Sequence, residues 1–175
     1  MDNREDTRRA IQAGQTALGI ELGSTRIKAV LIGPDHSPVA GGAFDWENQL
    51  TDGLWSYPLE QAVQGVQTAY RHMAGQVKEK YGVTLTKLGA MGVSAMMHGY
   101  LAFDEAGRQL CPFRTWRNTV TQREAEMLTE EFNFNIPQRW SIAHLYRAVR
   151  LGEEHVPKIA FLTTLAGYIH WQLTG

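Results

Sequence analysis

A chain of 175 residues with a net charge of −1 is long enough for one domain with a sizeable core and short for two. This balance gives no electric field that would favour nucleic acid or an anionic membrane as a partner, and no apolar run approaches membrane-spanning length. Cys111 is the single cysteine, which excludes an internal disulfide and a cysteine-based metal site. These features fit the cytoplasm, where thiols stay reduced.

Residues 1–15 are polar and charged, and they lack the apolar core of a signal peptide. We expect a flexible leader, loose or partly helical, that takes no part in the chemistry. A single lobe is expected to follow over residues 16–175.

Residues 17–32 consist of two apolar runs around a short polar turn, a pattern that predicts two adjacent antiparallel strands. Glycine in such a turn can take a positive φ and let a ligand approach the backbone, hydroxyls and N–H groups can face a phosphate, and a lysine adds a point charge. Glu21, on the rim of the turn, can hold a divalent metal directly or through water. An ordinary hairpin with a solvated tip uses the same residue types. The candidate phosphate ligands are Gly23, Ser24, Thr25 and Lys28.

The remaining pattern predicts a third strand, a helix, a buried strand, a hairpin, two helices, a short strand and a last helix. Three antiparallel strands followed by crossover helices predict an α/β fold, a mixed sheet with helices on both faces. This order resembles the ribonuclease-H-like lobe shared by sugar kinases, actin and the heat-shock ATPases. The expected elements are strand 39–44, loop 45–56, a helix from Pro58 to Tyr81, strand 88–97, hairpin 100–111, helix 121–132 with a Thr121–Glu124 capping box, a helix from Pro137, strand 159–162 and helix 164–173.

A second group of polar residues follows the predicted buried strand at 88–97. Strand ends are where open α/β sheets assemble ligand sites, and His98 stands just past this one. A neutral imidazole can donate to or accept from a sugar hydroxyl, and Gly99 lets the chain turn sharply. A histidine that only caps the turn backbone explains the position equally well.

The two segments together resemble the FGGY family of carbohydrate kinases. Residues 17–32 are similar to the family's first phosphate loop, with Glu21 where an Asp is usual. Met97, His98 and Gly99 are similar to the end of the family's next strand, with Met96 where Gln is frequent. The resemblance implies that Met97, His98 and Gly99 bind the sugar and that Glu21 binds the metal.

Two further segments carry the same resemblance. Trp116 and Asn118 match a Trp followed two places on by Asp or Asn, while Val120 stands where Arg is expected. Trp116 can pack on an apolar sugar face and Asn118 can bond a hydroxyl, although Trp116 can equally be a core anchor. The segment 164–175 is similar to the family's helix ending in Leu-Thr-Gly.

The resemblance implies the N-terminal part of an ATP-dependent, Mg²⁺-dependent kinase of a ketose or polyol, with xylulose as one option. Phosphoryl transfer needs a base to accept the hydroxyl proton, and in the family that base is an Asp beyond the Leu-Thr-Gly helix. No catalytic residue is therefore expected up to Gly175. We expect the missing C-terminal lobe of the same protein as a partner and little activity from these 175 residues alone.

Two other functional classes stay open at this stage. One is a non-catalytic module that binds a sugar or phosphate. The other is a lobe of an actin-like ATPase, against which Met97, His98, Gly99 and Trp116 argue, because that class needs no polyol pocket. The sequence does not identify the sugar, and it leaves open whether the protein forms a homo-oligomer.

Overall fold

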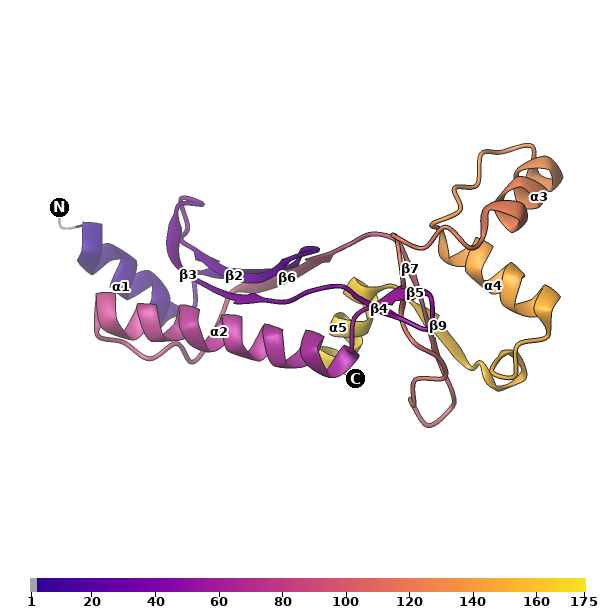
Figure 1. The fold of residues 1–175 in the computed structure, drawn as a ribbon. Helices are drawn as coiled ribbons and strands as arrows, with labels where there is room; N and C mark the ends of the chain where they lie inside the picture. The colour runs from indigo at the N-terminus through magenta and orange to yellow at the C-terminus, as the bar shows by residue number, and fades with distance from the viewer. Residues whose placement is uncertain (1–2) are drawn as a thin grey trace. The chain divides into compact units, whose positions relative to one another are not determined.

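The computed structural model describes residues 3–175 (Figure 1), which divide into two compact units. The first unit comprises the chain up to Glu47 together with Glu60–Ala95, and the second comprises Asn48–Leu59 together with Met96–Gly175. None of the described helices is long and apolar enough to cross a membrane.

The first unit is built around a four-stranded sheet of order β3-β2-β1-β6. β1 pairs antiparallel with β2, β2 pairs antiparallel with β3, and β6 runs parallel to β1. The predicted α/β fold, with three antiparallel strands first in a mixed sheet, is confirmed. Its elements are α1 (Asn3–Ala13), β1 (Ala17–Leu22), β2 (Arg26–Ile32), β3 (Pro38–Asp45), α2 (Leu59–Tyr81) and β6 (Ala90–Ala95).

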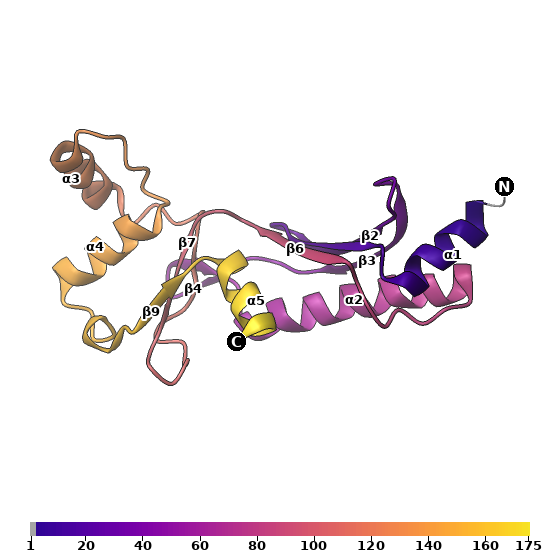
Figure 2. The ribbon, with the colours of Figure 1, turned by 180° about the vertical axis from the view of Figure 1, so that it is seen from behind.

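Helix α2 packs along one face of this sheet (Figure 2). Alternation in β2 places Ile27, Ala29 and Leu31 in the core, each with no exposed surface. The helix and β3 approach so closely that a Cβ on Gly42 would lie 2.0 Å from the carbonyl oxygen of Ala69. The opposite face of β1 and β2 carries exposed side chains, among them Glu21 and Lys28, whereas the other candidate phosphate residues lie in the turn between the two strands.

Two expectations for the first unit differ from the structure. The predicted flexible leader is helical over Asn3–Ala13, and Ile11 on this helix is 2% exposed because it packs into the core. The strand expected to be buried on both faces, β6, is the edge of the sheet, and Met91 in it is 47% exposed. A short apolar run shows that a segment is suited to a sheet but does not tell which strands flank it.

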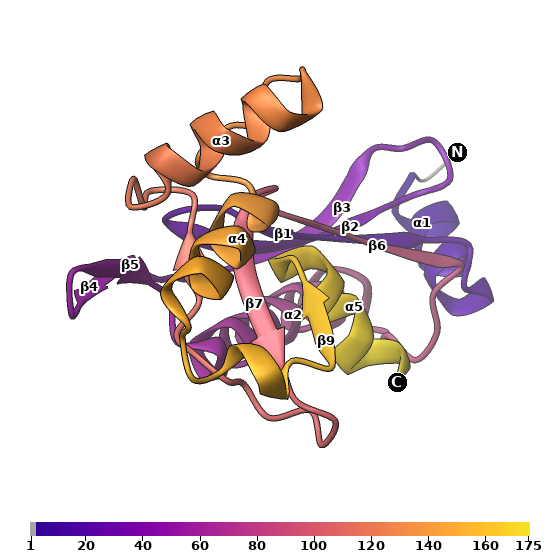
Figure 3. The same cartoon turned by 90° about the vertical axis from the view of Figure 1, so that its right-hand side faces the viewer.

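The second unit contains a three-stranded antiparallel sheet of order β8-β7-β9 and a separate hairpin, β4–β5. Figure 3 shows β7 beside β9, with α4 alongside β7. The elements are β4 (Gln49–Thr51), β5 (Leu54–Ser56), β7 (Gly99–Phe103), β8 (Arg114–Thr115), α3 (Gln122–Phe132), α4 (Ser141–Leu151), the 3₁₀ helix η1 (Val156–Lys158), β9 (Phe161–Thr163) and α5 (Leu165–Thr174).

The stretch predicted as a loop at 45–56 instead contains the β4–β5 hairpin. Asp52 and Gly53 form its turn, with φ of 50° and 76°. Two consecutive positive φ angles are the geometry of a type I′ turn, which matches the twist of paired strands. The Asp52-Gly53 pair is a sequence signal for such a hairpin. The polar and aromatic residues around this pair made the whole stretch resemble a loop.

One predicted capping box and one predicted helix start are also wrong. α3 begins where expected, but the Thr121 side chain makes no capping bond and instead donates to the carbonyl of Gln138. Glu124, the other half of the expected capping box, pairs with Arg150. α4 begins at Ser141 rather than at Pro137, because residues 137–140 form a turn before the helix.

Candidate functional site

The predicted phosphate turn lies between β1 and β2 and is tight. Leu22 pairs with Ile27, and the Gly23 N–H donates to the Arg26 carbonyl at 3.0 Å, which leaves Ser24 and Thr25 exposed at the tip. Gly23 does not adopt the positive φ that we considered. Its small size matters instead, since an added Cβ would lie 3.1 Å from the carbonyl oxygen of Arg26.

Glu21 and Lys28 lie side by side on the open face of the sheet. The Lys28 ammonium is 3.2 Å from a Glu21 carboxylate oxygen, and both side chains are about half exposed, at 48% and 54%. The parallel register also sets Ser94 of β6 beside Glu21. These residues line a shallow depression of about 500 Å³. Ser94 was missed from the sequence because only the pairing of β6 with β1 brings it there.

A single carboxylate at this place can hold Mg²⁺ only as one ligand among several. No group of three metal-binding side chains occurs among the residues that the structure describes. Mg²⁺ keeps several waters and is commonly bound through one or two carboxylates plus phosphate oxygens. Glu21 fits that mode, whereas a dedicated cage of protein ligands does not exist here.

The predicted sugar-binding residues lie in the second unit next to the strands β7 and β8. Gly99 begins β7, Met97 and His98 precede it, and Trp116 and Asn118 follow β8. Gly99 pairs with Thr115 in an antiparallel ladder. His98 directly precedes Gly99 in the chain, and Trp116 directly follows Thr115, where the turn 115–118 begins. Gly99 has a φ of 145°, and a Cβ there would lie 2.4 Å from the Phe113 ring. Only glycine fits both this conformation and this contact.

His98 lies next to two residues that sequence reasoning missed. Its ring stacks on Trp140, with centroids 6.3 Å apart, and the positive charge of Arg139 acts on it. Burial and, secondarily, this charge lower the pKa of His98, so its imidazole is neutral near pH 7. A neutral imidazole can both donate and accept a hydrogen bond. Met97 and Trp116, 75% and 40% exposed, are open to a ligand.

Asn118, unlike Met97 and Trp116, is buried, and its side-chain amide is hydrogen-bonded to backbone groups. Its Oδ1 accepts from the Trp55 N–H at 2.9 Å, and its Nδ2 donates to the carbonyls of Trp55 and Thr115 at 2.8 and 3.0 Å. The side chain therefore fastens the β4–β5 hairpin to the segment after β8. Its bond to a sugar hydroxyl stays a prediction.

A charged network lies behind the β7–β8 pair. Arg114 of β8, 6% exposed, forms an ion pair with Glu153, and the Tyr100 hydroxyl is 2.8 Å from Nε2 of His155. Burial alone would raise the pKa of Glu153, but the hydrogen bond and charge of Arg114 lower it. His144 packs against Tyr100 with neither ring nitrogen bonded.

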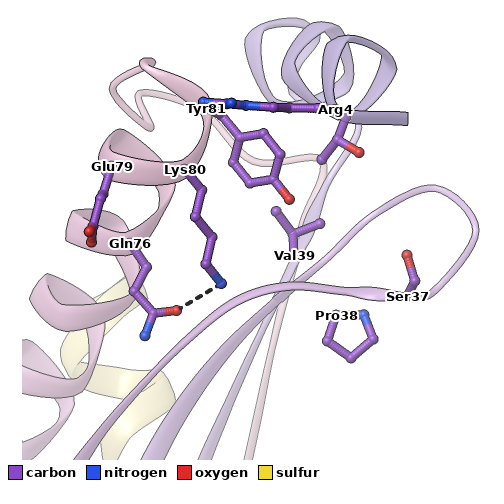
Figure 4. Close-up of a pocket in the computed structure, with 9 residues that line it drawn as sticks. Arg4, Ser37, Pro38, Val39, Gln76, Glu79, Lys80 and Tyr81 are labelled. Atoms are coloured by element: carbon purple, nitrogen blue, oxygen red, sulfur yellow. Dashed lines mark hydrogen bonds between the residues drawn. The ribbon is translucent and has the colours of Figure 1, made fainter. Parts of the chain in front are cut away.

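The structure thus gathers the predicted residues into two groups. The phosphate and metal candidates belong to the first unit, and the sugar candidates belong to the second. A pocket of about 850 Å³ in the first unit contains none of them (Figure 4). It is lined by residues of α1, the start of β3 and the end of α2, where Lys80 lies 3.5 Å from Gln76.

Comparison with known proteins identifies the family. The model of the N-terminal domain of the FGGY family of carbohydrate kinases matches residues 16–175, whereas no curated protein matches the sequence. Among solved structures, the fold is similar to a xyloylose kinase from Brucella ovis (TM-score 0.79, 21% identity, 89% of this chain and 33% of that one). It is also similar to xylulose kinase from Rhodospirillum rubrum (0.78, 17%, 90% and 34%).

A third solved structure, glycerol kinase from Plasmodium falciparum with ADP, has a TM-score of 0.62 and 14% identity over 79% of this chain and 29% of its own. The chain therefore spans about one third of the length of these kinases. The match of the family model extends over nearly all of the sequence, from the first strand to the last helix. The chain belongs to the FGGY family of carbohydrate kinases.

Proposed function

We propose that this chain is the N-terminal part of an ATP-dependent kinase that phosphorylates a hydroxyl group of a ketose or polyol, xylulose among the candidates. The observation that supports the sugar assignment is the pairing of Gly99 with Thr115, because the neutral His98 directly precedes Gly99 and Trp116 directly follows Thr115. An aromatic face that covers the apolar side of a sugar, next to a group that can bond its hydroxyls, is how proteins recognise polyols.

The nucleotide side of the reaction is assigned to the first unit. Mg²⁺ and ATP, when bound, supply the phosphoryl group and neutralise its charge. Ser24 and Thr25 offer hydroxyls at the exposed turn, and Lys28 offers a cation that Glu21 already orients. Glu21 would be one Mg²⁺ ligand. The proton acceptor for the sugar hydroxyl is assigned to a second lobe of the same protein, beyond Gly175, so this chain supplies binding rather than proton transfer.

The assay is ADP release from Mg²⁺-ATP with a panel of ketoses and polyols, run on the protein with its second lobe and on residues 1–175 alone. We expect turnover from the first and none from the second. Robust turnover by residues 1–175 would overturn the assignment of the base to a second lobe. Sugar binding by the longer protein without any ADP release would favour a non-catalytic binding module.

His98→Ala tests the sugar site in the same protein. We expect a weaker apparent affinity for the sugar, seen as a raised KM, with the KM for ATP unchanged. His170→Ala is the matched control, because His170 is an exposed histidine of the same unit on helix α5. Equal KM values for sugar in wild type and His98→Ala, with folding intact by circular dichroism, would remove His98 from the site.

We also propose that the protein acts in the cytoplasm, where ATP and a reduced Cys111 are found together. A small-molecule sugar and the second lobe are the partners that this function requires. Neither nucleic acid nor a membrane has a role in it.

A further inference from the structure

Helix α4 begins against the turn that carries His98. The hydroxyl of Ser141, the first residue of α4, donates a hydrogen bond to the carbonyl of Gly99. Trp140 directly precedes the helix, and its indole stacks on the imidazole of His98, with the ring centroids 6.3 Å apart and the planes at 28°. Two consecutive residues at the start of one helix therefore contact two consecutive residues of the proposed sugar site.

Trp140 is itself held in place by the residues around it. It packs against a buried apolar cluster formed by α3, α4 and the loop between them, with the members Ala125, Leu128, Ile136 and Ala143. Its backbone N–H donates to the carbonyl of Pro137 at 3.0 Å, and its carbonyl accepts from the N–H of Ala143 at 3.1 Å. A half-buried ring that is fixed by packing and by its backbone offers a rigid surface to a neighbouring side chain.

His98 depends on this surface for its orientation. Within the part of the chain that the structure describes, its imidazole makes no hydrogen bond or ion pair, so both ring nitrogens stay available to a ligand. The ring is therefore oriented by its rotamer and its packing. The stacked indole also covers one face of the imidazole and so contributes to the burial that lowers the pKa of His98.

We propose that Trp140 is a positioning residue of the sugar site, which holds the imidazole of His98 in the orientation that bonds a substrate hydroxyl. The inference rests on the kinase function proposed above. Trp140 acts through His98 and needs no contact with the sugar itself. Its loss should weaken sugar binding without abolishing it, because His98 stays present but samples more orientations.

The test measures ADP release by the full-length protein at varied sugar concentration. We expect Trp140→Leu to raise the KM for sugar about threefold to tenfold, the range of one aromatic pair, with kcat and the KM for ATP unchanged. Trp140→Phe keeps an aromatic face and should restore the KM for sugar to within about twofold of wild type. Phe132→Leu is the matched control, because Phe132 is an exposed aromatic residue at the end of α3.

A double variant and a pH profile separate positioning from a general loss of stability. In a His98→Ala background, Trp140→Leu should raise the KM for sugar no further, because the residue through which it acts is gone. The neutral imidazole both donates and accepts, so this KM should rise as the pH falls through the pKa of His98. Removing the indole exposes the ring and moves its pKa up toward the ordinary value, so the rise should begin at a higher pH in Trp140→Leu.

Each outcome decides a different point. An unchanged KM for sugar in Trp140→Leu would overturn the positioning role and keep the kinase function. An equal rise of this KM with and without His98 would show that Trp140 acts independently of His98, which also overturns the proposal. Absence of ADP release by the wild type with every sugar would overturn the kinase function and the proposal with it. Circular dichroism and an unchanged KM for ATP show that each variant is folded.

Discussion

The role of Asn118 can be tested by removing its amide. Asn118→Ala deletes the three hydrogen bonds to Trp55 and Thr115 and leaves the partly buried N–H and carbonyl of Trp55 without the amide, whereas the Thr115 carbonyl still accepts from the Asn118 backbone N–H. At about 0.5–1.5 kcal/mol for each of the three bonds, the loss of stability in the second unit is about 1.5–4.5 kcal/mol. The Asn118→Asp variant keeps the acceptor but sets a carboxylate oxygen against two carbonyls, so it should be no more stable than Asn118→Ala.

Two measurements detect the loss of stability caused by Asn118→Ala. Urea unfolding gives the free energy of unfolding, and amide hydrogen exchange at Trp55 reports the hairpin directly, since its N–H bonds to Asn118. Thr119→Ala, at an exposed neighbour, is the control. If Asn118→Ala unfolds within about 0.5 kcal/mol of wild type, the range of a neutral surface change, and protection at Trp55 is unchanged, the amide does not hold the hairpin.

Three further predictions concern other parts of the chain. Burial and, secondarily, the charge of Arg114 lower the pKa of His144 to about 4. Between about pH 6.5 and pH 4 the unfolded state therefore binds more protons than the folded state, and the free energy of unfolding falls as the pH falls through that range. His144→Phe should remove up to about 1.4 kcal/mol per pH unit of this slope, and urea unfolding at pH 5 and pH 7 checks it; an unaltered slope would contradict the buried neutral imidazole. Gly99→Ala should destabilise by about 1–3 kcal/mol, from its φ of 145° and the contact with Phe113, and thermal unfolding equal to wild type would refute this. Glu21→Gln should raise the Mg²⁺ concentration needed for turnover by the full-length protein but change unfolding by less than about 1 kcal/mol, since its pair with Lys28 is half exposed; an unchanged Mg²⁺ requirement would remove Glu21 from the metal site.

Local signals in the sequence were sufficient for β1, β2, β3 and α2 of the first unit. Two apolar runs around a polar turn in 17–32 predicted both strands and the turn between them. Tyr81-Gly82 ended α2 as expected, with Gly82 at a φ of 69°. The same kind of reasoning failed at residues 49–56, where the Asp-Gly turn signal was outweighed by the polar and aromatic residues around it.

The sequence by itself determined the family, the order of the first strands, and the residue types that suit phosphate and sugar. Tertiary structure decided which of these residues meet. Asn118 reaches Trp55 across 63 residues of chain, and Ser94 joins Glu21 only through the parallel pairing of β6 with β1. The reason is physical: strand periodicity and turn geometry act over a few neighbouring residues, whereas a hydrogen bond or a cation–π stack between distant segments depends on how the whole unit packs.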